Sequence, residues 1–372
     1  MKLIDKTVNY DENGKPDGIP TYLYDQAEAY QRDPRDAGLE WFASAKLGLS
    51  LHYGLSTLLG VPEDPAEHEN FNLEQYRLLP QKFSCAHFDA MDIAELAIAS
   101  GARYISMPAK LKDGFCLFNA PDTEYSSVKS PAQRDLVGEM ASVCEYHGLG
   151  LCLTYPFTKN WMNNTVIDKP ASPTSDTPDE EPFEIIKEKG APENLEEFKT
   201  PFQKTAEKQI RYLLSEYGPI AALKIDGFED ALKKPILKRT FSTITKLAAI
   251  LQPQILVSFQ QGLTGDENFY TVDQAIPSPK TSKNIQGLIH DDASKPLELR
   301  FPMSPSSFSY SALLAGKHLT AAAAWALLEK TRLQQSNLLL HTCLMPDGSL
   351  DLEDINTLLE LGKHIETTGF PD

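Results

Sequence analysis

The sequence predicts an α/β fold, specifically a (β/α)8 barrel, and three observations carry this prediction. Short apolar, β-rich runs alternate along the chain with amphipathic helical segments. Several of the predicted helices end at a glycine, which favours short turns back into a parallel sheet. The 372 residues suffice for one closed barrel, and no G-x-G-x-x-G or G-x-x-x-x-G-K-S/T motif follows a predicted strand. The barrel is therefore favoured over an open nucleotide-binding sheet.

The predicted elements follow one another in strand–helix order from residue 47 onward. Strands are expected at 47–54, 103–107, 149–155, 220–225, 255–259 and 337–343. Helices are expected at 88–100, 135–147, 202–217, 237–251, 321–335 and 352–368. Asp89 is expected to cap the first of these helices, and Gly101 and Gly148 to end the first two.

The domain prediction is a single barrel over residues 1–372, with an N-terminal extension over 1–38. Residues 168–197 are acidic and proline-rich, and they interrupt the strand–helix order. We expect an exposed loop insertion there, on the face where loops after the strands build active sites. An acidic insertion without a role is the alternative.

Composition excludes several partners. The chain has 35 Lys+Arg against 52 Asp+Glu, a formal charge of −17, which argues against nucleic acid or an anionic membrane as the main partner. No apolar stretch is long enough to span a membrane, and no signal peptide is visible at the N-terminus. Five scattered cysteines without a C-x-x-C pair indicate reduced thiols, so we expect a cytoplasmic protein without a zinc site.

Polar residues at the C-terminal ends of barrel strands are the first functional candidates. Asp226 follows the apolar run 220–225 and precedes a glycine, a place where a buried carboxylate costs free energy unless partners compensate. His52 ends the first strand and Tyr155 the third. The alternatives remain open at this point: Asp226 as a loop anchor or helix cap, His52 as a core histidine, Tyr155 as a packing ring.

Several segments together resemble the α-L-fucosidases, glycoside hydrolase family 29. Residues 41–54, WFASAKLGLSLHYG, resemble that family's W-F-x-x-A-K-F-G-I-F-I-H-W-G segment. Residues 110–115, KLKDGF, lie where the family has K-H-H-D-G-F, and 134–139 equal its R-D-L-V-G-E. Residues 337–340 and 346–349 resemble N-L-L-L-N-x-G-P-x-P-D-G-S. The likeness runs from about residue 39 to 370, and it ends where many family members continue into a β-sandwich, so we expect the catalytic barrel alone.

The resemblance implies a barrel that cleaves α-L-fucosyl bonds with retention, through a covalent intermediate on Asp226. It places the sugar-binding residues at His52, Glu74 and Tyr155. A retaining glycosidase needs a second carboxylate about 5–5.5 Å from the first, as acid and then base. The resemblance puts Asp273 there, with Glu267 and Glu298 as rivals. No cofactor or metal is implied.

The departures from the family pattern lie in the sugar pocket. Leu111 and Lys112 replace two adjacent histidines, and Lys224 replaces the tryptophan two residues before the nucleophile. An arginine after the fifth strand is replaced by Gln260 or Gln261. Lys112 and Lys224 are therefore added to the predicted substrate-binding residues, and they favour a more anionic or differently shaped sugar.

The predicted function is a retaining exo-glycoside hydrolase of the α-L-fucosidase type with an altered sugar pocket. Its partner is a carbohydrate, an α-L-fucoside or a related and more anionic sugar. Two alternatives stay open: a catalytically inactive carbohydrate-binding relative, motivated by the missing histidines, and a barrel enzyme of other chemistry that reuses Asp226. The oligomeric state is left open.

Overall fold

Eight parallel strands form the centre of the molecule. The computed structural model describes residues 18–60, 72–157, 201–226, 235–259, 267–274, 295–305 and 307–372. The strands in this part of the chain are β1 (Leu47–His52), β2 (Tyr104–Pro108), β3 (Gly150–Pro156), β4 (Ala222–Asp226), β5 (Leu256–Phe259), β6 (Tyr270–Asp273), β7 (Leu297–Pro302) and β8 (Asn337–Cys343). The predicted insertion at 168–197 and the first 17 residues of the predicted extension lie outside the described residues.

The sheet curls into a nearly closed barrel. Its hydrogen-bonded order is β5-β4-β3-β2-β1-β8-β7-β6, and β5 and β6 at the two ends of that order lie beside each other. The backbone N–H of Asn268 donates to the carbonyl of Val257 at 2.8 Å, and the Ser258 hydroxyl donates to the carbonyl of Phe269 at 2.9 Å. These bonds join β5 to the residues that lead into β6. The predicted (β/α)8 barrel is confirmed.

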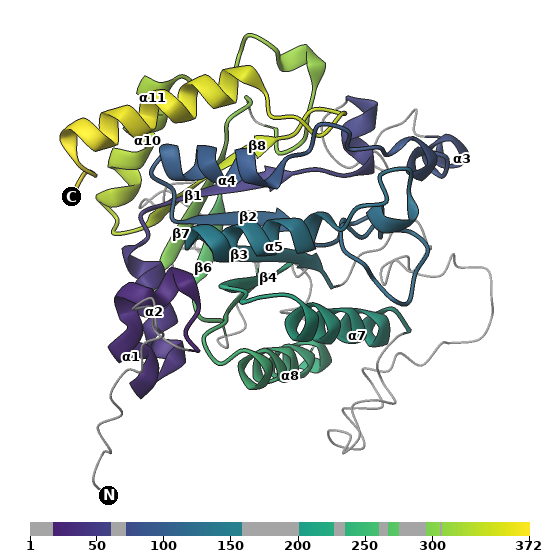
Figure 1. Ribbon diagram of the computed structural model, residues 1–372, viewed down its shortest axis with the longest axis horizontal. Helices are drawn as coiled ribbons and strands as arrows, with labels where there is room; N and C mark the ends of the chain where they lie inside the picture. The colour runs from purple at the N-terminus through teal and green to yellow at the C-terminus, as the bar shows by residue number, and fades with distance from the viewer. Residues whose placement is uncertain are drawn as a thin grey trace, which may run out of the picture.

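Helices cover the outside of the barrel (Figure 1). Those described are α1 (Ala27–Arg32), α2 (Pro34–Ser44), α3 (Leu73–Tyr76), α4 (Ala90–Ala99), α5 (Leu136–His147), α7 (Pro201–Glu216), α8 (Pro235–Leu251), α10 (Ala321–Arg332) and α11 (Leu352–Thr368). In Figure 1, α4 and α5 lie over β2 and β3, α7 and α8 lie on one flank, and α10 and α11 lie on the opposite one. No helix in the described part of the chain is long and apolar enough to cross a membrane.

The ends of the outer helices follow the predicted signals. Asp89 caps α4 by accepting hydrogen bonds from the backbone N–H groups of Met91 and Asp92. Gly148 ends α5 in the left-handed conformation, with φ of 70°, and Gly101 after α4 has φ of 85°. The predicted positions of these ends are confirmed to within a few residues.

Two strands, β6 and β7, were not predicted from the sequence. β6 has only four residues, and β7 alternates apolar residues with Glu298 and Arg300. That alternation has the period of two that indicates a strand, so β7 could have been predicted from the sequence. β6 is too short for its pattern to stand out from the neighbouring sequence, which has no clear period.

Helix α2 closes the N-terminal end of the barrel. Phe42 lies 4.3 Å from Phe269, and Trp41 meets the ring of Tyr104 edge-on, between ring centroids 6.3 Å apart. The side chain of Asn337, the first residue of β8, donates to the carbonyl of Phe42 at 2.6 Å. Aromatic rings therefore fill this end, and ligand access from it is blocked by packing.

Two glycines make room for these rings. A Cβ added to Gly150 would lie 2.2 Å from the indole of Trp41, and one added to Gly48 would lie 2.3 Å from the ring of Tyr104. Both distances are far below van der Waals contact, so any side chain at either position displaces an aromatic ring. The aromatic packing at the closed end therefore requires glycine at both positions, one of which, Gly48, lies in the segment 41–54.

Candidate active site

The inward-facing residues at the C-terminal strand ends define the mouth of the barrel. Lys224 of β4 and Glu298 of β7 meet across the interior, with 2.6 Å between Nζ and Oε1. This contact fixes which face of each strand points inward. Because side chains alternate along a strand, Asp226 and Arg300, two residues further on, also face inward, at the C-terminal ends of their strands.

The register of the neighbouring strands adds three more inward-facing residues. Asp273 is the β6 partner of Arg300, and His341 of β8 is the partner of Ser50 in β1. His52 follows Ser50 by two residues and faces the same way. The rings of His52 and His341 lie 6.0 Å apart. The mouth is therefore lined by two carboxylates, one guanidinium and two imidazoles from five strands.

Asp226 has a cation beside it. Its Oδ2 lies 3.7 Å from Nζ of Lys112, and the side chain of Asp226 is 18% exposed. Lys112 belongs to the segment after β2, and its side chain is 41% exposed at the edge of the mouth. The structure brings these two predicted residues together.

His52 is held as a neutral imidazole. Burial, together with the positive charges of Arg300 and Lys112, lowers the pKa of His52 from 6.5 to about 4. Its Nε2 is buried and has no hydrogen-bond partner among the described residues. A buried polar atom without a partner costs free energy, so this nitrogen is a natural contact for a ligand hydroxyl.

Asp273 is engaged by Arg300. Nε and one Nη of the guanidinium donate to its two oxygens at 2.7 and 2.8 Å. A bidentate arginine favours the ionised carboxylate, whereas a catalytic acid must carry a proton. Asp273 therefore lies at the mouth with Asp226. To carry a proton as a catalytic acid, it would have to give up a hydrogen bond from Arg300.

His341 belongs to the wall behind this pair. Its Nε2 donates to the carbonyl of Phe308 at 3.0 Å, and its Nδ1 lies 2.9 Å from the Ser50 hydroxyl. Burial, aided by the nearby charge of Arg300, lowers the pKa of His341 well below 6.5. The ring of Phe308 in turn lies 4.3 Å from the guanidinium carbon of Arg300.

Lys224 lies deeper in the barrel than the mouth. Its ammonium pairs with Glu298, whose side chain is fully buried and also accepts from the hydroxyls of Tyr104 at 2.7 Å and Thr271 at 3.1 Å. A carboxylate with this many partners and no exposed surface is part of the barrel interior. Neither member of the pair is at the surface that a sugar would reach from the mouth.

Tyr155 faces the helices. Its neighbour in β4 is Ile225, and both alternate with inward-facing residues. The Tyr155 hydroxyl donates to Oε1 of Gln209 in α7 at 2.6 Å and accepts from Nζ of Lys110 at 3.4 Å. The structure thus places Tyr155 in a buried polar cluster between β3 and α7.

Glu74 and Glu267 lie away from the mouth in different directions. The Glu74 side chain is 80% exposed on the short helix α3 and pairs with Arg77 at 2.8 Å. Glu267 is buried, and the next residue, Asn268, bonds to Val257 near the start of β5. Glu267 therefore lies toward the N-terminal ends of the strands, whereas Asp226 lies at a C-terminal end.

Leu111 takes up space beside the mouth. A Cβ added to Gly54, two residues after His52, would lie 2.1 Å from a methyl group of Leu111. The leucine therefore packs on the backbone that follows β1. Gln260 and Gln261, the predicted replacements of an arginine, lie outside the described residues.

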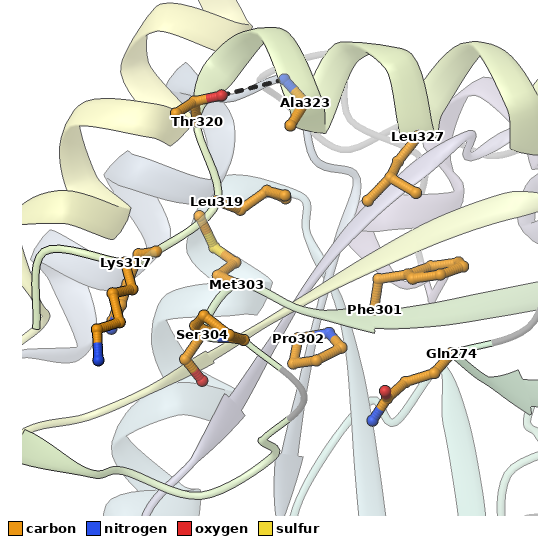
Figure 2. A pocket seen from close by; sticks show the side chains of 12 residues that line it. Gln274, Phe301, Pro302, Met303, Ser304, Lys317, Leu319, Thr320, Ala323 and Leu327 are labelled. Carbon is orange, nitrogen blue, oxygen red and sulfur yellow. Dashed lines mark hydrogen bonds between the residues drawn. The ribbon is translucent and has the colours of Figure 1, made fainter. Parts of the chain in front are cut away.

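A hollow of about 460 Å³ lies at the end of β7 (Figure 2). Figure 2 shows Phe301, Met303, Leu319 and Leu327 around it, with Lys317 at one side. It is lined by Gln274, Phe301, Pro302, Met303, Ser304, Pro305, Lys317, His318, Leu319, Thr320, Ala323 and Leu327. Phe301 alternates with Arg300, whereas Pro302 follows Arg300 by two residues, so the hollow is lined from both faces of the end of β7.

One group of described residues has metal-ligand chemistry, and it is remote from the mouth. His318, Asp351 and Glu353 lie close enough for one ligand atom from each to meet. The imidazole Nδ1 of His318 is 2.8 Å from Asp354, and the Glu353 carboxylate accepts from the backbone N–H of Gly316 at 2.6 Å. These bonds tie the loop before α10 to the start of α11.

Comparison with known proteins identifies the family. The α-L-fucosidase family profile matches residues 24–370. The chain belongs to the α-L-fucosidase family. Its predicted membership is thereby confirmed, and the five strands that form the mouth all fall within the matched range.

The relatives match in short stretches of sequence. A putative α-L-fucosidase 1 of Oryza sativa subsp. japonica is 32% identical over 123 residues, which cover 32% of this chain and 22% of that protein. An α-L-fucosidase of Dictyostelium discoideum is 24% identical over 146 residues, which cover 33% of this chain and 32% of that protein. The matched stretches thus span a third or less of these α-L-fucosidases.

Solved α-L-fucosidases share the fold over most of the chain. Isoenzyme 1 from Paenibacillus thiaminolyticus has a TM-score of 0.69 and 23% identity, over 90% of this chain and 77% of that one. The Thermotoga maritima α-fucosidase, solved in complex with fucose, has a TM-score of 0.66 and 21% identity, over 89% of this chain and 74% of that one. These α-L-fucosidases confirm the architecture.

Arg300 and His341, which also lie at the mouth of the barrel, were not predicted from the sequence. Arg300 lies in a strand that was not recognised, so the strand-end rule was never applied to it. His341 lies in a predicted strand, 337–343, and an inward-facing histidine two residues before its end was a usable signal. Pairing β8 with β1 is what reveals that it lies beside His52.

Proposed function

We propose that the protein is a retaining α-L-fucosidase in which Asp226 is the nucleophile. The observation that carries this proposal is the inward position of Asp226 at the end of β4, at the open end of a barrel whose other end is closed by α2. The family membership and the partly exposed carboxylate support the same reading.

The proposed reaction has two steps. A carboxylate oxygen of Asp226 attacks the anomeric carbon, and the bond to the leaving oxygen breaks while a second carboxylic acid protonates that oxygen. The same group, now a carboxylate, then takes a proton from water, which attacks the anomeric carbon and releases Asp226. The sugar leaves with its original anomeric configuration.

Asp273 is the proposed acid and base. Of the three carboxylates predicted for this role, it is the one at the mouth with Asp226, while Glu267 lies toward the other strand ends and Glu298 is enclosed with Lys224. For Asp273 to act as an acid, one of its bonds to Arg300 has to open when the substrate enters.

His52 and Lys112 are the proposed sugar contacts that the geometry supports. His52 offers a neutral ring with an unpartnered, buried Nε2, and Lys112 offers an ammonium beside Asp226. Glu74, Tyr155 and Lys224 remain predictions for this role. Each already bonds to another side chain away from the mouth, so the proposal does not depend on them.

A neutral fucoside is the proposed substrate. Lys112 and Arg300 are balanced at the mouth by Asp226 and Asp273, and the charge of Lys224 is balanced by Glu298. Sulfated sugar, the anionic alternative, is the competing substrate in the assay. If the enzyme turns over a sulfated aryl fucoside faster than the plain one, the anionic prediction replaces the neutral one.

An inactive carbohydrate-binding relative is the second candidate function. It is favoured by one observation: both mouth carboxylates lie in ion pairs, Asp226 with Lys112 and Asp273 with Arg300. A protein that only binds sugar would hold its carboxylates in this way without needing to release either.

Turnover of an aryl α-L-fucoside decides between the two. The proposal predicts hydrolysis by the wild type, lowered by several orders of magnitude in Asp226→Asn, because an amide cannot attack the anomeric carbon. Asp89→Asn, at an exposed helix cap, is the matched control and should leave the rate within about twofold. Sugar binding without any turnover would establish the second candidate instead.

A further inference from the structure

Among the described residues at the mouth, Arg300 has a side chain that is both fixed in orientation and left with unused hydrogen-bond donors. We propose that Arg300 is a substrate-recognition residue, which donates to a hydroxyl oxygen of the sugar bound beside Asp226. This assignment rests on the proposed fucosidase function, and it names a contact that the sequence motifs do not contain.

The position of Arg300 places its charge at the reacting centre. It lies at the C-terminal end of β7 on the inward face, and its side chain is 16% exposed. Burial opposes its charge, yet the carboxylates of Asp273 and, beyond it, Asp226 raise the pKa of Arg300 above its ordinary value. Its charge also acts on His52. Arg300 is thus a permanent cation within electrostatic reach of His52 and of both carboxylates at the mouth.

The hydrogen bonds of Arg300 are incomplete. A guanidinium has five N–H donors. Asp273 takes two of them, one on Nε and one on Nη2, and no other acceptor for Arg300 occurs among the described residues. Three donors are left, and none of them belongs to a buried nitrogen without a partner, so they are open to solvent at the mouth, where an oxygen of a ligand can replace water. A ligand with oxygen acceptors would satisfy them.

The plane of the guanidinium is set by its neighbours before any ligand arrives. Asp273 holds one edge, and the ring of Phe308 lies against one face at 4.3 Å. Phe308 is itself held, because its carbonyl accepts from Nε2 of His341 at 3.0 Å. Rotamer entropy that would otherwise be lost on binding is therefore already lost, which favours recognition.

Sugar hydroxyls match this environment. Arginine only donates, whereas a hydroxyl both accepts and donates. One hydroxyl can therefore accept a hydrogen bond from Arg300 and donate a hydrogen bond to another acceptor at the mouth. His52 is neutral and its Nε2 is open, so the two side chains can contact neighbouring hydroxyls of one ring.

The competing reading is structural. Asp273 and Arg300 are direct partners in the β6–β7 register, so their ion pair could serve only to join these two strands. In that case Arg300 would affect stability and the general geometry of the mouth. It would not discriminate between sugars that differ by a single hydroxyl.

The test is a cycle between enzyme and substrate variants. The kcat/KM values of wild type and Arg300→Met are measured for an aryl α-L-fucoside and for its 2-, 3- and 4-deoxy analogues. For one deoxy analogue, we expect the fall in kcat/KM relative to the parent fucoside to be about 10- to 100-fold larger in the wild type than in Arg300→Met. The variant has already lost the charged hydrogen bond, so removing the hydroxyl costs it nothing more. The other two analogues should be affected equally in both enzymes.

Arg134 provides a matched control. It donates to both oxygens of Glu139 and lies 5.4 Å from the ring of Phe88, an environment like that of Arg300 but away from the mouth. Arg134→Met should lower stability without coupling to any hydroxyl. If Arg300→Met does not fold, Arg300→Lys is measured in the same cycle. A lysine cannot bond to Asp273 and also donate to the sugar hydroxyl with the geometry of an arginine.

The outcomes separate this inference from the proposed function. If every deoxy analogue lowers kcat/KM by the same factor in the wild type and in the Arg300 variant, the inference is overturned, while the proposed fucoside turnover stands. If the wild type binds the fucosides without hydrolysing them, the same cycle is run with their dissociation constants, and a single coupled hydroxyl supports the inference although the hydrolase proposal fails. A wild type that neither binds nor hydrolyses any of the fucosides overturns both.

Discussion

Asp226 and Asp273 each have a cation beside them at the mouth of the barrel. Lys112 is 3.7 Å from Asp226, and Arg300 donates to both oxygens of Asp273. A nucleophile gains from a neighbouring cation because it must be ionised to attack, whereas an acid is hindered by one. The two carboxylates are thus matched to different tasks only if the Asp273 pair opens during the reaction.

The leaving group reports on the role of Asp273. In Asp273→Ala, kcat/KM for a fucoside with a poor leaving group should fall by about 10²- to 10⁴-fold, because that oxygen needs a proton. A dinitrophenyl fucoside, whose leaving group needs none, should lose far less. Glu267→Gln is the control and should show no such contrast. Equal losses for both substrates in Asp273→Ala would remove Asp273 from the acid role.

His52 should make stability depend on pH. Its pKa of about 4 lies below the usual 6.5, so the folded protein favours the neutral ring. That stabilisation is complete above pH 6.5 and is lost as the pH falls through 4. Since one pKa unit corresponds to 1.36 kcal/mol, the loss is about 3 kcal/mol.

Urea denaturation at pH 7 and pH 4 measures this effect. His52→Gln should lose about 3 kcal/mol less free energy of unfolding than the wild type between the two pH values. His364→Gln, which changes an exposed histidine, should follow the wild type. An identical pH dependence for His52→Gln would mean that the His52 ring is solvated in the folded protein.

At the scale of the elements, α4 and α11 pack through a glycine. A Cβ on Gly362 of α11 would lie 1.7 Å from the backbone carbonyl oxygen of Ala99 at the end of α4. Backbone cannot yield as a flexible side chain does, so the two helices must separate. The contact lets α11 cover the barrel beside α4 and α10 (Figure 1).

Gly362→Ala tests this contact. The free energy of unfolding should fall by about 1–3 kcal/mol, the usual range for an overpacked interface. Lys363→Ala, at an exposed position of the same helix, should change it by no more than about 0.5 kcal/mol. Denaturation midpoints that agree within error for the two variants would show that α11 can shift away at little cost.

Some of these elements could be predicted from the sequence and others could not. Helix α4 was predictable because Asp89, its apolar face and Gly101 all indicate the same segment. Strand β4 was predictable as an apolar run that ends in a carboxylate. β6 has only four residues and gave too little pattern, whereas β7 alternates polar and apolar residues and could have been predicted. Which face of either strand points inward depends on the closed sheet.

The site could be predicted in part for the same reason. Asp226 and His52 end recognisable strands, so their position at the mouth followed from the barrel itself. Glu74 was assigned by likeness to a motif, and Tyr155 by its place at a strand end as well as by likeness. Nothing local indicates that Glu74 pairs with Arg77 in solvent or that Tyr155 bonds to Gln209. Such contacts depend on how helices pack on the sheet, which is not encoded in a strand's own residues.

At the scale of the whole molecule, a net charge of −17 surrounds an interior that contains a buried ion pair. Lys224 and Glu298 connect β4 to β7 across the barrel, with side chains 5% and 0% exposed. Taking charges out of water is costly, and removal of one partner leaves the other uncompensated. This explains how a lysine can replace an apolar residue inside the barrel: the glutamate opposite balances it.

Two variants measure the cost of this pair. Lys224→Met should lower the free energy of unfolding by about 3–5 kcal/mol, and Lys224→Met/Glu298→Gln should recover most of it, because the amide oxygen can still accept from Tyr104. Asp25→Ala, in an exposed pair with Arg103, should cost at most about 1 kcal/mol. A double variant no more stable than Lys224→Met would contradict this account, and loss of turnover in a stable double variant would return Glu298 to the reaction.

The central claim is that this barrel forms a covalent fucosyl intermediate on Asp226. A 2-deoxy-2-fluoro-α-L-fucosyl donor with a good leaving group slows the second step more than the first, so the intermediate accumulates. Mass spectrometry of the digested protein should then find one fluorofucosyl group on the peptide that contains Asp226, and none in Asp226→Ala. A label on a different carboxylate, or no label on a protein that turns over fucosides, would contradict the claim.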